Sequence, residues 1–336
     1  MNLSTYRSLD DKLIKEIDDF LILGETLLNP LYSSPLWALR LKKIIKFNYI
    51  FLVLRQNNQV RAVQLVFQGY RGYQKIDKLP SYIRLFARFF ARIFFGYHMW
   101  FDSTVFLNNE SNQNKKIIKK IIYAELVKFQ NLRESPVWGE DQVFFPKKKS
   151  LSWGTFLIHI PENSYEAVFS KFNANTRRQI RNIKLKGCYV RELNSDNLEE
   201  YSKWLKVNQG VTGKSNRIDV ELIKYDLDIF NKANYIYKVF IAYNDGRMLG
   251  SLSIWGFGDY VVEHGVYRSK SAKDNQYNEQ DLLKDWAIRF ALENNVTIFD
   301  LGGFNPNNNI SKKEEGIKNY KKKFGGDEIL YNNVSS

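Results

Sequence analysis

The feature that most constrains the fold is a pattern of two strands, a helix and a further strand that occurs twice along the chain. Each copy begins with two apolar runs separated by a short polar turn, at residues 56–59 in the first half and 244–247 in the second. The second turn contains Asp245-Gly246, a strong signal for a two-residue β-hairpin turn. The repeat therefore predicts a duplicated α/β domain.

The repeated pattern also predicts where the remaining elements and the domain boundary lie. The helices and strands that complete the two copies are expected at 116–130 and 135–138, and at 279–293 and 296–299. A solvated, lysine-rich link near 146–152 separates the copies, which places the two domains at 1–150 and 151–327. We expect an α/β fold of the α+β type, with mixed, mostly antiparallel sheets flanked by helices.

Composition restricts the class of protein and its partners. The chain has 336 residues, of which 44% are apolar, so it is long enough for two domains with real cores. Its net charge of +14 favours polyanions as partners: RNA, phosphorylated substrates or an anionic membrane face. Cys188 is the single cysteine, which excludes an internal disulfide and a multi-cysteine zinc site. With no signal peptide expected at residues 1–12, we predict a cytoplasmic protein.

The first half contains an insertion at 80–101 that the second half lacks. Within it, Arg84, Arg88 and Arg92 recur every fourth residue among phenylalanine, leucine, isoleucine and alanine, so they share one helical face. A basic amphipathic helix of this kind suits the inner face of a membrane. The alternative is a core helix whose arginines lie in water.

A second candidate feature is a strand that ends in a carboxylate and a glycine turn, Asp300-Leu-Gly-Gly303, followed by a basic segment at 320–324. Lys321 in that segment is a candidate for stabilising the oxyanion that forms when an amine attacks an ester. Asp300 is a candidate for holding the amine or taking its proton. The alternatives are a solvated basic run and an aspartate that caps the glycine turn.

A long helix is predicted at 165–186, with Phe172, Thr176, Ile180 and Ile183 forming its inner stripe. Arg177, Arg181 and Lys184 lie together beside that stripe, with Arg178 flanking them. Three clustered cations can hold a pyrophosphate or an RNA backbone, and arginine does so bidentately. A solvated basic face is the alternative. Further candidates for substrate binding are Glu263, Tyr267, Asn305 and Tyr320. No metal ligands, phosphate-binding loop or nucleophile motif is found.

Taken in order, these pieces resemble the Fem family of cell-wall aminoacyltransferases (FemABX-like, with two tandem GNAT-type domains). The resemblance rests on residues 151–327. The segments that carry it are Asn175-Thr-Arg-Arg-Gln-Ile-Arg181, Phe240-Ile-Ala-Tyr-Asn-Asp-Gly-Arg-Met-Leu-Gly250, Trp286-Ala-Ile, Phe299-Asp-Leu-Gly-Gly303 and Tyr320-Lys-Lys-Lys-Phe-Gly-Gly326. In the first half the likeness is only architectural.

The resemblance implies two GNAT-like domains that share a cleft, the first completed by residues 328–336. It implies transfer of an amino acid from aminoacyl-tRNA to an amine of a peptidoglycan-type precursor that carries a phosphorylated or lipid-linked tail, without a metal or bound organic cofactor. Lys321 matches the lysine of the family's Phe-Lys motif, although Tyr320 replaces the phenylalanine. Arg177, Arg178 and Arg181 match its arginine-rich helix.

Two other functions stay open. One is an N-acyltransferase that uses acyl-CoA or an acyl carrier protein to modify a sugar in envelope polysaccharide biosynthesis. An acyl-CoA loop needs glycines so that backbone N–H groups reach the pyrophosphate, and residues 268–279 contain none. The other is an RNA-binding module without a transfer site, whose binding would depend strongly on salt.

Overall fold

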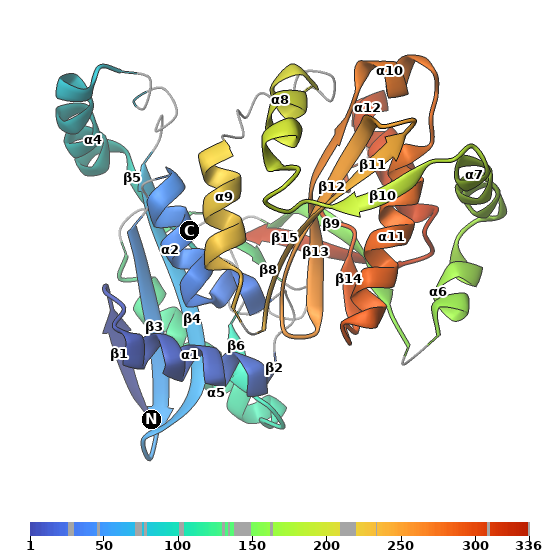
Figure 1. Ribbon diagram of the computed structural model, residues 1–336. Helices are drawn as coiled ribbons and strands as arrows, with labels where there is room; N and C mark the ends of the chain where they lie inside the picture. Colours follow the sequence, from blue (N-terminus) through green and yellow to red (C-terminus); the bar gives the residue numbers. More distant parts are fainter. Residues whose placement is uncertain are drawn as a thin grey trace. The chain divides into compact units, whose positions relative to one another are not determined.

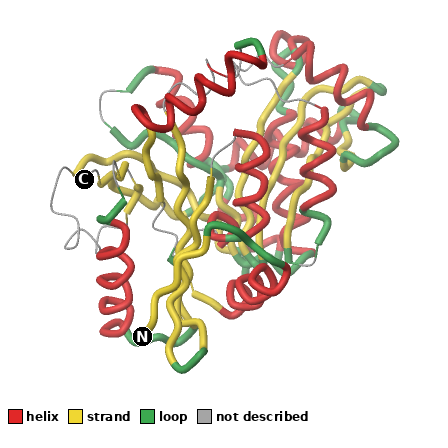
Figure 2. The backbone as a smooth tube through the Cα atoms, turned by 90° about the vertical axis from the view of Figure 1, so that its left-hand side faces the viewer, coloured by secondary structure: helices red, strands yellow, loops and turns green. Residues whose placement is uncertain are grey.

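The computed structural model describes residues 1–25, 30–45, 48–70, 76, 79–100, 104–129, 132–133, 135–137, 149–161, 164–208, 220–232, 234–307 and 310–334 (Figures 1 and 2). The chain divides into two compact units. The first comprises Met1–Trp153 together with Leu330–Ser336, and the second comprises Gly154–Ile329. None of the helices in the described ranges is long and apolar enough to cross a membrane.

The first unit is built on a sheet with the strand order β1-β3-β4-β5-β7, to which β6 and β2 are attached through β4. Its strands are β1 Asn2–Tyr6, β2 Gly24–Glu25, β3 Asn48–Gln56, β4 Gln59–Tyr70, β5 Gly96–Trp100, β6 Val105–Leu107, β7 Leu132–Arg133 and β8 Ser135–Val137. Its helices are α1 Asp11–Leu23, the 3-10 helix η1 Pro30–Ser33, α2 Pro35–Ile45, α4 Ser81–Phe95 and α5 Asn112–Leu126.

The second unit contains the sheet order β10-β11-β12-β13-β14-β9-β15, and residues 332–334 at the end of β15 pair with β8. Its strands are β9 Lys149–His159, β10 Tyr189–Glu192, β11 Tyr235–Asn244, β12 Arg247–Phe257, β13 Tyr260–Arg268, β14 Ile298–Asp300 and β15 Asp327–Val334. Its helices are α6 Tyr165–Lys171, α7 Ala174–Leu185, α8 Leu198–Asn208, α9 Val220–Ile229, α10 Lys270–Asp274, α11 Glu279–Glu293 and α12 Lys312–Lys322.

The two predicted hairpins are confirmed. Asn57 and Asn58 link β3 to β4 with φ angles of 51° and 63°, and Asp245 and Gly246 link β11 to β12 with φ angles of 47° and 74°. Positive φ at both central residues gives the turn whose twist matches paired strands. Most strand pairs are antiparallel, whereas β13 and β14 pair in parallel, so the predicted mixed sheet is also confirmed.

The core of the second unit lies between its sheet and helix α11. This helix contacts β11, β12 and α7, while α8 contacts β13 and α9 contacts β11 (Figure 1). Large side chains that are almost completely buried fill the space between the elements: Phe156, Phe172, Phe240, Phe299 and Phe324. The strand that carries Asp300 is therefore fixed between β13 and β9.

The single helix predicted at 165–186 is wrong, because the chain forms the two helices α6 and α7. Phe172 ends α6 in an extended conformation, and the Asn173 side chain accepts a hydrogen bond from Thr176 N at 2.7 Å to begin α7. An asparagine at the N-cap competes well with helix continuation. The predicted inner stripe is nevertheless buried, since the break does not change the face that Thr176, Ile180 and Ile183 share.

Candidate functional site

The candidate site lies where β13 and β14 stop pairing. Their parallel ladder joins Tyr260 to Ile298 and ends at Val262 and Asp300. Beyond that point the chain turns through Gly302, which stays close to Glu263 on β13. Ligands of α/β folds commonly bind at the carboxyl ends of parallel strands.

Asp300 holds the glycine turn that follows β14. One carboxylate oxygen accepts hydrogen bonds from Gly302 N, at 2.7 Å, and from the Thr155 hydroxyl, and the other accepts one from the Tyr260 hydroxyl at 2.9 Å. Burial raises the pKa of Asp300, and these donors partly offset that rise. Its bonding is that of a carboxylate that caps a turn, the alternative that the sequence left open.

Lys321 reaches the same turn from α12. Its ammonium group donates to Gly303 O at 2.9 Å, and its side chain is buried. Burial lowers the pKa of Lys321 to about 8, although the charge of Asp300 acts in the opposite direction. Gly302 has a φ of 74°, and a Cβ there would lie 2.9 Å from Glu263 O and 3.3 Å from Lys321 Nζ. The backbone can approach the lysine so closely only because residue 302 is glycine.

A second lysine lies beside the first and was not predicted from the sequence. Lys284 on α11 is buried in an ion pair with Glu263 and lies 5.4 Å from the ring centre of Tyr320 and 5.2 Å from that of Phe324. Burial lowers the pKa of Lys284 well below its usual value, and the nearby charges of Lys321 and Lys323 lower it further. Glu263, a predicted substrate-binding residue, is thus committed to an internal ion pair.

The basic segment 320–324 distributes its side chains in several directions. Lys321 faces the glycine turn, Lys322 is exposed, and Phe324 lies in the core. Lys323 forms an ion pair with Asp281 at 2.6 Å and lies 4.1 Å from the ring centre of Tyr320. The segment is therefore only in part the solvated run that was the alternative from the sequence.

Tyr320 and Lys323 also line a cavity of about 300 Å³ within the second unit. Most of the other lining groups are amides, hydroxyls and charged side chains from the starts of α7 and α11: Asn173, Asn175, Thr176, Gln179, Arg268, Tyr277, Asn278, Gln280 and Asp281. Thr176 Oγ1 and Gln280 Oε1 are buried and have no hydrogen-bond partner among the described residues. A cavity with such unsatisfied polar atoms is a candidate for binding a polar ligand.

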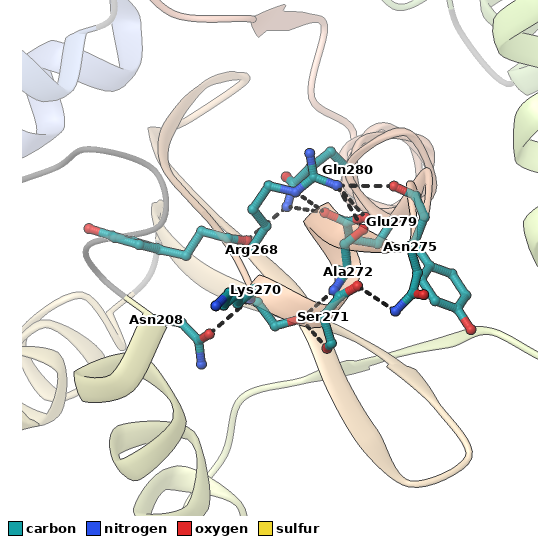
Figure 3. A network of polar contacts seen from close by, with 11 residues as sticks. Asn208, Arg268, Lys270, Ser271, Ala272, Asn275, Glu279 and Gln280 are labelled. Atoms are coloured by element: carbon teal, nitrogen blue, oxygen red, sulfur yellow. Dashed lines mark hydrogen bonds and ion pairs between the residues drawn. The ribbon is translucent and has the colours of Figure 1, made fainter.

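The loop from β13 to α11, shown in Figure 3, is organised around a cation of the protein itself. The Arg268 guanidinium donates to the carbonyl oxygens of Ala272 and Tyr277, at 3.3 and 3.2 Å, and forms an ion pair with Glu279 at 3.0 Å. A loop that binds the pyrophosphate of acyl-CoA presents N–H groups inward instead. In this protein, carbonyl oxygens of the loop point inward to Arg268, which is the reverse of the arrangement that binds an anionic pyrophosphate.

Further hydrogen bonds fix this loop in place (Figure 3). Asn208 at the end of α8 accepts one from Lys270 N at 3.2 Å, and Asn275 donates to Ser271 O at 2.9 Å. Gln280 donates to Tyr267 O at 2.8 Å. Glu279 and Asp281 also place two carboxylates in the first turn of α11, where the helix dipole favours negative charge, and they are paired with Arg268 and Lys323.

The predicted arginine cluster does not line this cavity. Arg177 donates to the carbonyl oxygens of Ser170, at 2.7 Å, and of Phe172, so it stabilises the corner between α6 and α7. Arg178 donates to Asn175 at 2.8 Å, and Arg181 lies 5.8 Å from the ring centre of Phe169. Arg178 and Arg181 are exposed and remain available to an anion, whereas the guanidinium of Arg177 is largely used within the protein.

The remaining predicted residues surround the site without converging on one point. Tyr267 is buried, and burial raises the pKa of its hydroxyl to about 12. Asn305 donates to Glu314 at 3.0 Å, which ties the loop after β14 to the start of α12. No group of histidine, cysteine, aspartate and glutamate side chains in the described ranges is arranged to hold a metal ion.

The residues that the sequence analysis did not identify are charged residues at buried positions of α11. Helix α11 buries four charged side chains in its first two turns, Glu279, Asp281, Lys284 and Asp285. Each is paired with another element: the partners are Arg268 on β13, Lys323 after α12, Glu263 on β13 and Lys184 on α7. Charged residues at the core positions of a helix indicate a buried polar network, unless the buried face of the helix has been assigned wrongly.

Comparison with known proteins identifies the fold. No family model matches the sequence, and no curated protein matches it either. FemX superimposes with a TM-score of 0.69 at 12% identity, and the match covers 98% of this chain and 96% of FemX. A conserved protein of unknown function from Bacteroides thetaiotaomicron VPI-5482 gives a TM-score of 0.58 at 11% identity and covers 100% of both chains. L-PGS from Bacillus licheniformis gives 0.54 at 10% identity, over 96% of this chain and 90% of L-PGS.

At these identities the likeness establishes the fold alone. The chain has the fold of FemX, and the match extends over nearly its whole length. The resemblance to the Fem family, which the sequence carried only on residues 151–327, is therefore confirmed at the level of the fold for both halves.

Proposed function

We propose that the chain is an aminoacyltransferase that moves an amino acid from aminoacyl-tRNA to an amine of a peptidoglycan-type envelope precursor. The observation that carries the proposal is Lys321, a buried lysine held against the glycine turn that follows β14, in a chain with the fold of FemX. With a pKa of about 8, Lys321 is protonated in most of the molecules at neutral pH.

In the proposed step, the acceptor amine attacks the carbonyl carbon of the aminoacyl ester. A C–N bond forms and the ester C–O bond breaks. The amine loses a proton, and the ribose oxygen of the tRNA gains one. The Lys321 ammonium stabilises the negative charge on the carbonyl oxygen, as a fixed donor in a water-poor site does most effectively. Asp300 positions the turn that holds Lys321, and its contact with the amine remains a proposal.

The other predicted residues take supporting roles in this proposal. Arg178 and Arg181 bind phosphates of the donor or acceptor, and Arg177 holds the helix that presents them. Tyr320 and the amides of the cavity bind an uncharged part of the donor. Asn305 borders the acceptor amine, whereas Glu263, held in its ion pair with Lys284, and the buried Tyr267 support the site from within the protein. No metal or bound organic cofactor takes part, and the reaction takes place in the cytoplasm, at the inner face of the membrane when the acceptor is lipid-linked.

The alternative is an N-acyltransferase that uses acyl-CoA or an acyl carrier protein. The second unit does not fit the pyrophosphate of CoA, because the loop around Arg268 turns carbonyl oxygens inward and Glu279 lies at the start of α11. This arrangement disfavours acyl-CoA as the donor in the second unit, whereas it does not exclude an acyl carrier thioester.

The experiment compares donors and variants in one assay. Radiolabelled aminoacyl-tRNA and acyl-CoA are offered with an envelope precursor, and products are identified by mass spectrometry. Lys321→Ala is expected to reduce transfer from aminoacyl-tRNA by about a hundredfold to a thousandfold. Lys322→Ala, at the exposed neighbouring position, is the matched control and should retain activity. Product from acyl-CoA alone would refute the donor, and undiminished turnover by Lys321→Ala would remove the lysine from the mechanism.

A further inference from the structure

Lys321 forms no ion pair with a carboxylate in the part of the chain that the structure describes. Its ammonium group donates to Gly303 O at 2.9 Å, and this acceptor is neutral. An ammonium that stabilises an oxyanion needs N–H groups and a positive charge that no carboxylate of the protein has already taken. Lys321 meets this need only if other donors occupy the acidic side chains nearby.

The first of these acidic side chains, Asp300, is held by neutral donors. Its carboxylate accepts hydrogen bonds from Gly302 N at 2.7 Å and from the hydroxyls of Thr155 and Tyr260. The charge of Asp300 acts on Lys321, since it opposes the effect of burial on the pKa of that lysine. The oxygens themselves, however, are engaged in the turn.

The second acidic side chain, Glu263, is held by Lys284. A Cβ on Gly302 would lie 2.9 Å from Glu263 O and 3.3 Å from Lys321 Nζ, so the main chain of Glu263 and the Lys321 ammonium border the same point. The carboxylate of Glu263 forms an ion pair with Lys284, and both side chains are buried. A buried carboxylate that loses such a partner takes another cation or becomes protonated.

Lys284 also lies against the segment that carries Lys321. Its Nζ is 5.4 Å from the ring centre of Tyr320 and 5.2 Å from that of Phe324. Burial lowers the pKa of Lys284, and the charges of Lys321 and Lys323 lower it further, so the three ammonium groups are close together. Lys323 is already bound by both carboxylate oxygens of Asp281, at 2.6 and 2.8 Å. Without Lys284, the cation left for Glu263 is Lys321.

We propose that Lys284 is a positioning residue for transfer: by holding Glu263, it keeps that carboxylate from pairing with Lys321, so that the Lys321 ammonium stays free for the carbonyl oxygen of the donor. The role in transfer rests on the proposed function, whereas the pairing is tested on the chain alone. The other titratable groups around Lys321 are Asp300 on β14, Tyr260 and Glu263 on β13, Asp281 and Lys284 on α11, and Tyr320, Lys322 and Lys323 on its own segment.

The first experiment follows the Lys321 side chain by NMR in the full chain, labelled with ¹³C at lysine Cε, with the signal identified by its loss in Lys321→Arg. In Lys284→Met, Glu263 pairs with Lys321, so the midpoint of the Lys321 titration should rise by about one pH unit or more. Adding Glu263→Gln should return the midpoint to within about half a unit of the native value. Lys184→Met removes the lysine partner of another buried carboxylate on α11, Asp285, and as the matched control it should leave the Lys321 midpoint unchanged.

The second experiment measures transfer from aminoacyl-tRNA by Lys284→Met and by the double variant. Lys284→Met should lower kcat by about tenfold to a hundredfold while KM changes by less than about threefold. The fall in rate at alkaline pH should move to higher pH together with the Lys321 midpoint. A lysine that only stabilises the fold would reduce the amount of active protein without moving that fall. The double variant should recover most of the turnover.

Circular dichroism and the thermal midpoint establish that each variant is folded. Lys284→Gln, whose amide still donates to Glu263, replaces Lys284→Met if that variant does not fold. The inference is overturned if the folded single variant has the native Lys321 midpoint, or if the double variant keeps the raised one. If the native chain transfers nothing from aminoacyl-tRNA, the proposed function fails, and the NMR titration alone decides whether Lys284 keeps Glu263 from Lys321.

Discussion

The two units repeat one plan, but they use the helix after the hairpin differently. In the first unit, α5 buries Ile118, Ile122 and Leu126, and its lysines lie at or near the surface. In the second, α11 buries four charged residues and pairs each of them with a neighbouring element. The same secondary structure thus supports an apolar packing surface in one unit and a buried polar network in the other.

The difference lies in the free energy of burying charge. Removing a charged group from water costs several kcal/mol per ion, about as much as its attraction to a buried partner contributes. The second unit buries four such charges on α11, one of them on Lys284 beside Lys321. Lysines with strongly lowered pKa values are candidates for functional residues. The first unit offers no equivalent among its described residues on α5.

The largest effect is expected from breaking the buried ion pair between Lys284 and Glu263, the clearest difference between α11 and α5. Lys284→Met leaves Glu263 buried without its partner and should lower the free energy of unfolding by about 3–5 kcal/mol, measured by urea denaturation. Adding Glu263→Gln should recover part of the loss, because the uncompensated charge is removed. A loss below about 1 kcal/mol for Lys284→Met would mean that the pair is not formed as described.

A smaller effect is expected at the glycine turn. Gly302→Ala should destabilise the protein by about 2 kcal/mol, since alanine at positive φ is strained and its Cβ would press on Glu263 O and Lys321 Nζ. Gly316→Ala in α12 is the matched substitution, because nothing lies within 4 Å of a Cβ there. It should stabilise the protein by roughly 0.5–1 kcal/mol. Equal thermal midpoints for the two variants would contradict the close approach at Gly302.

The pH dependence of transfer tests the state of Lys321. If the ammonium stabilises the oxyanion, transfer falls as pH rises through the pKa of about 8, by as much as tenfold per pH unit. Lys321 is mainly protonated below that pKa and mainly neutral above it, so the rate of transfer decreases on the alkaline side. An active Lys321→Arg variant should lack this fall, because its guanidinium stays charged. Activity that instead rises through pH 8 would assign a base to this position.

The smallest effect is expected in the first unit, at an exposed lysine on α5. Lys116→Met on α5 should change the free energy of unfolding by no more than about 0.5 kcal/mol. Paired with Lys284→Met, it measures directly how differently the two helices use a lysine. A comparable loss at both positions would remove the contrast between the units.

Much of the second unit followed from local signals in the sequence. The Asp245-Gly246 turn fixed the β11–β12 hairpin, and the helix at Glu279–Glu293 was predicted at its observed bounds. The predicted strand at 296–299 is found at Ile298–Asp300, with Asp300 at its end as expected. The break at Asn173 was missed, because the apolar stripe continues across it and the N-cap asparagine was not weighed against that stripe.

Within the site, the sequence identified the lysine and the glycine turn but not what surrounds them. Lys284 and Asp281 look like ordinary helix charges until the sheet beneath α11 is known. Arg177 looks like a phosphate ligand until Ser170 O and Phe172 O are seen to accept its hydrogen bonds. Lys284 is oriented by Glu263 on another strand, and Arg177 by the corner between α6 and α7, so the pattern of charges along one helix does not predict either orientation.

The sequence by itself determined the elements, because turn chemistry and apolar periodicity act over a few neighbouring residues. Only the tertiary structure decided which charges are buried, that two carbonyl oxygens of the loop after β13 face Arg268 and that Phe86, Phe89 and Phe90 are exposed. Each of these depends on which segments pack together, since burial, pKa and hydrogen-bond polarity are properties of the surroundings of a residue rather than of its type.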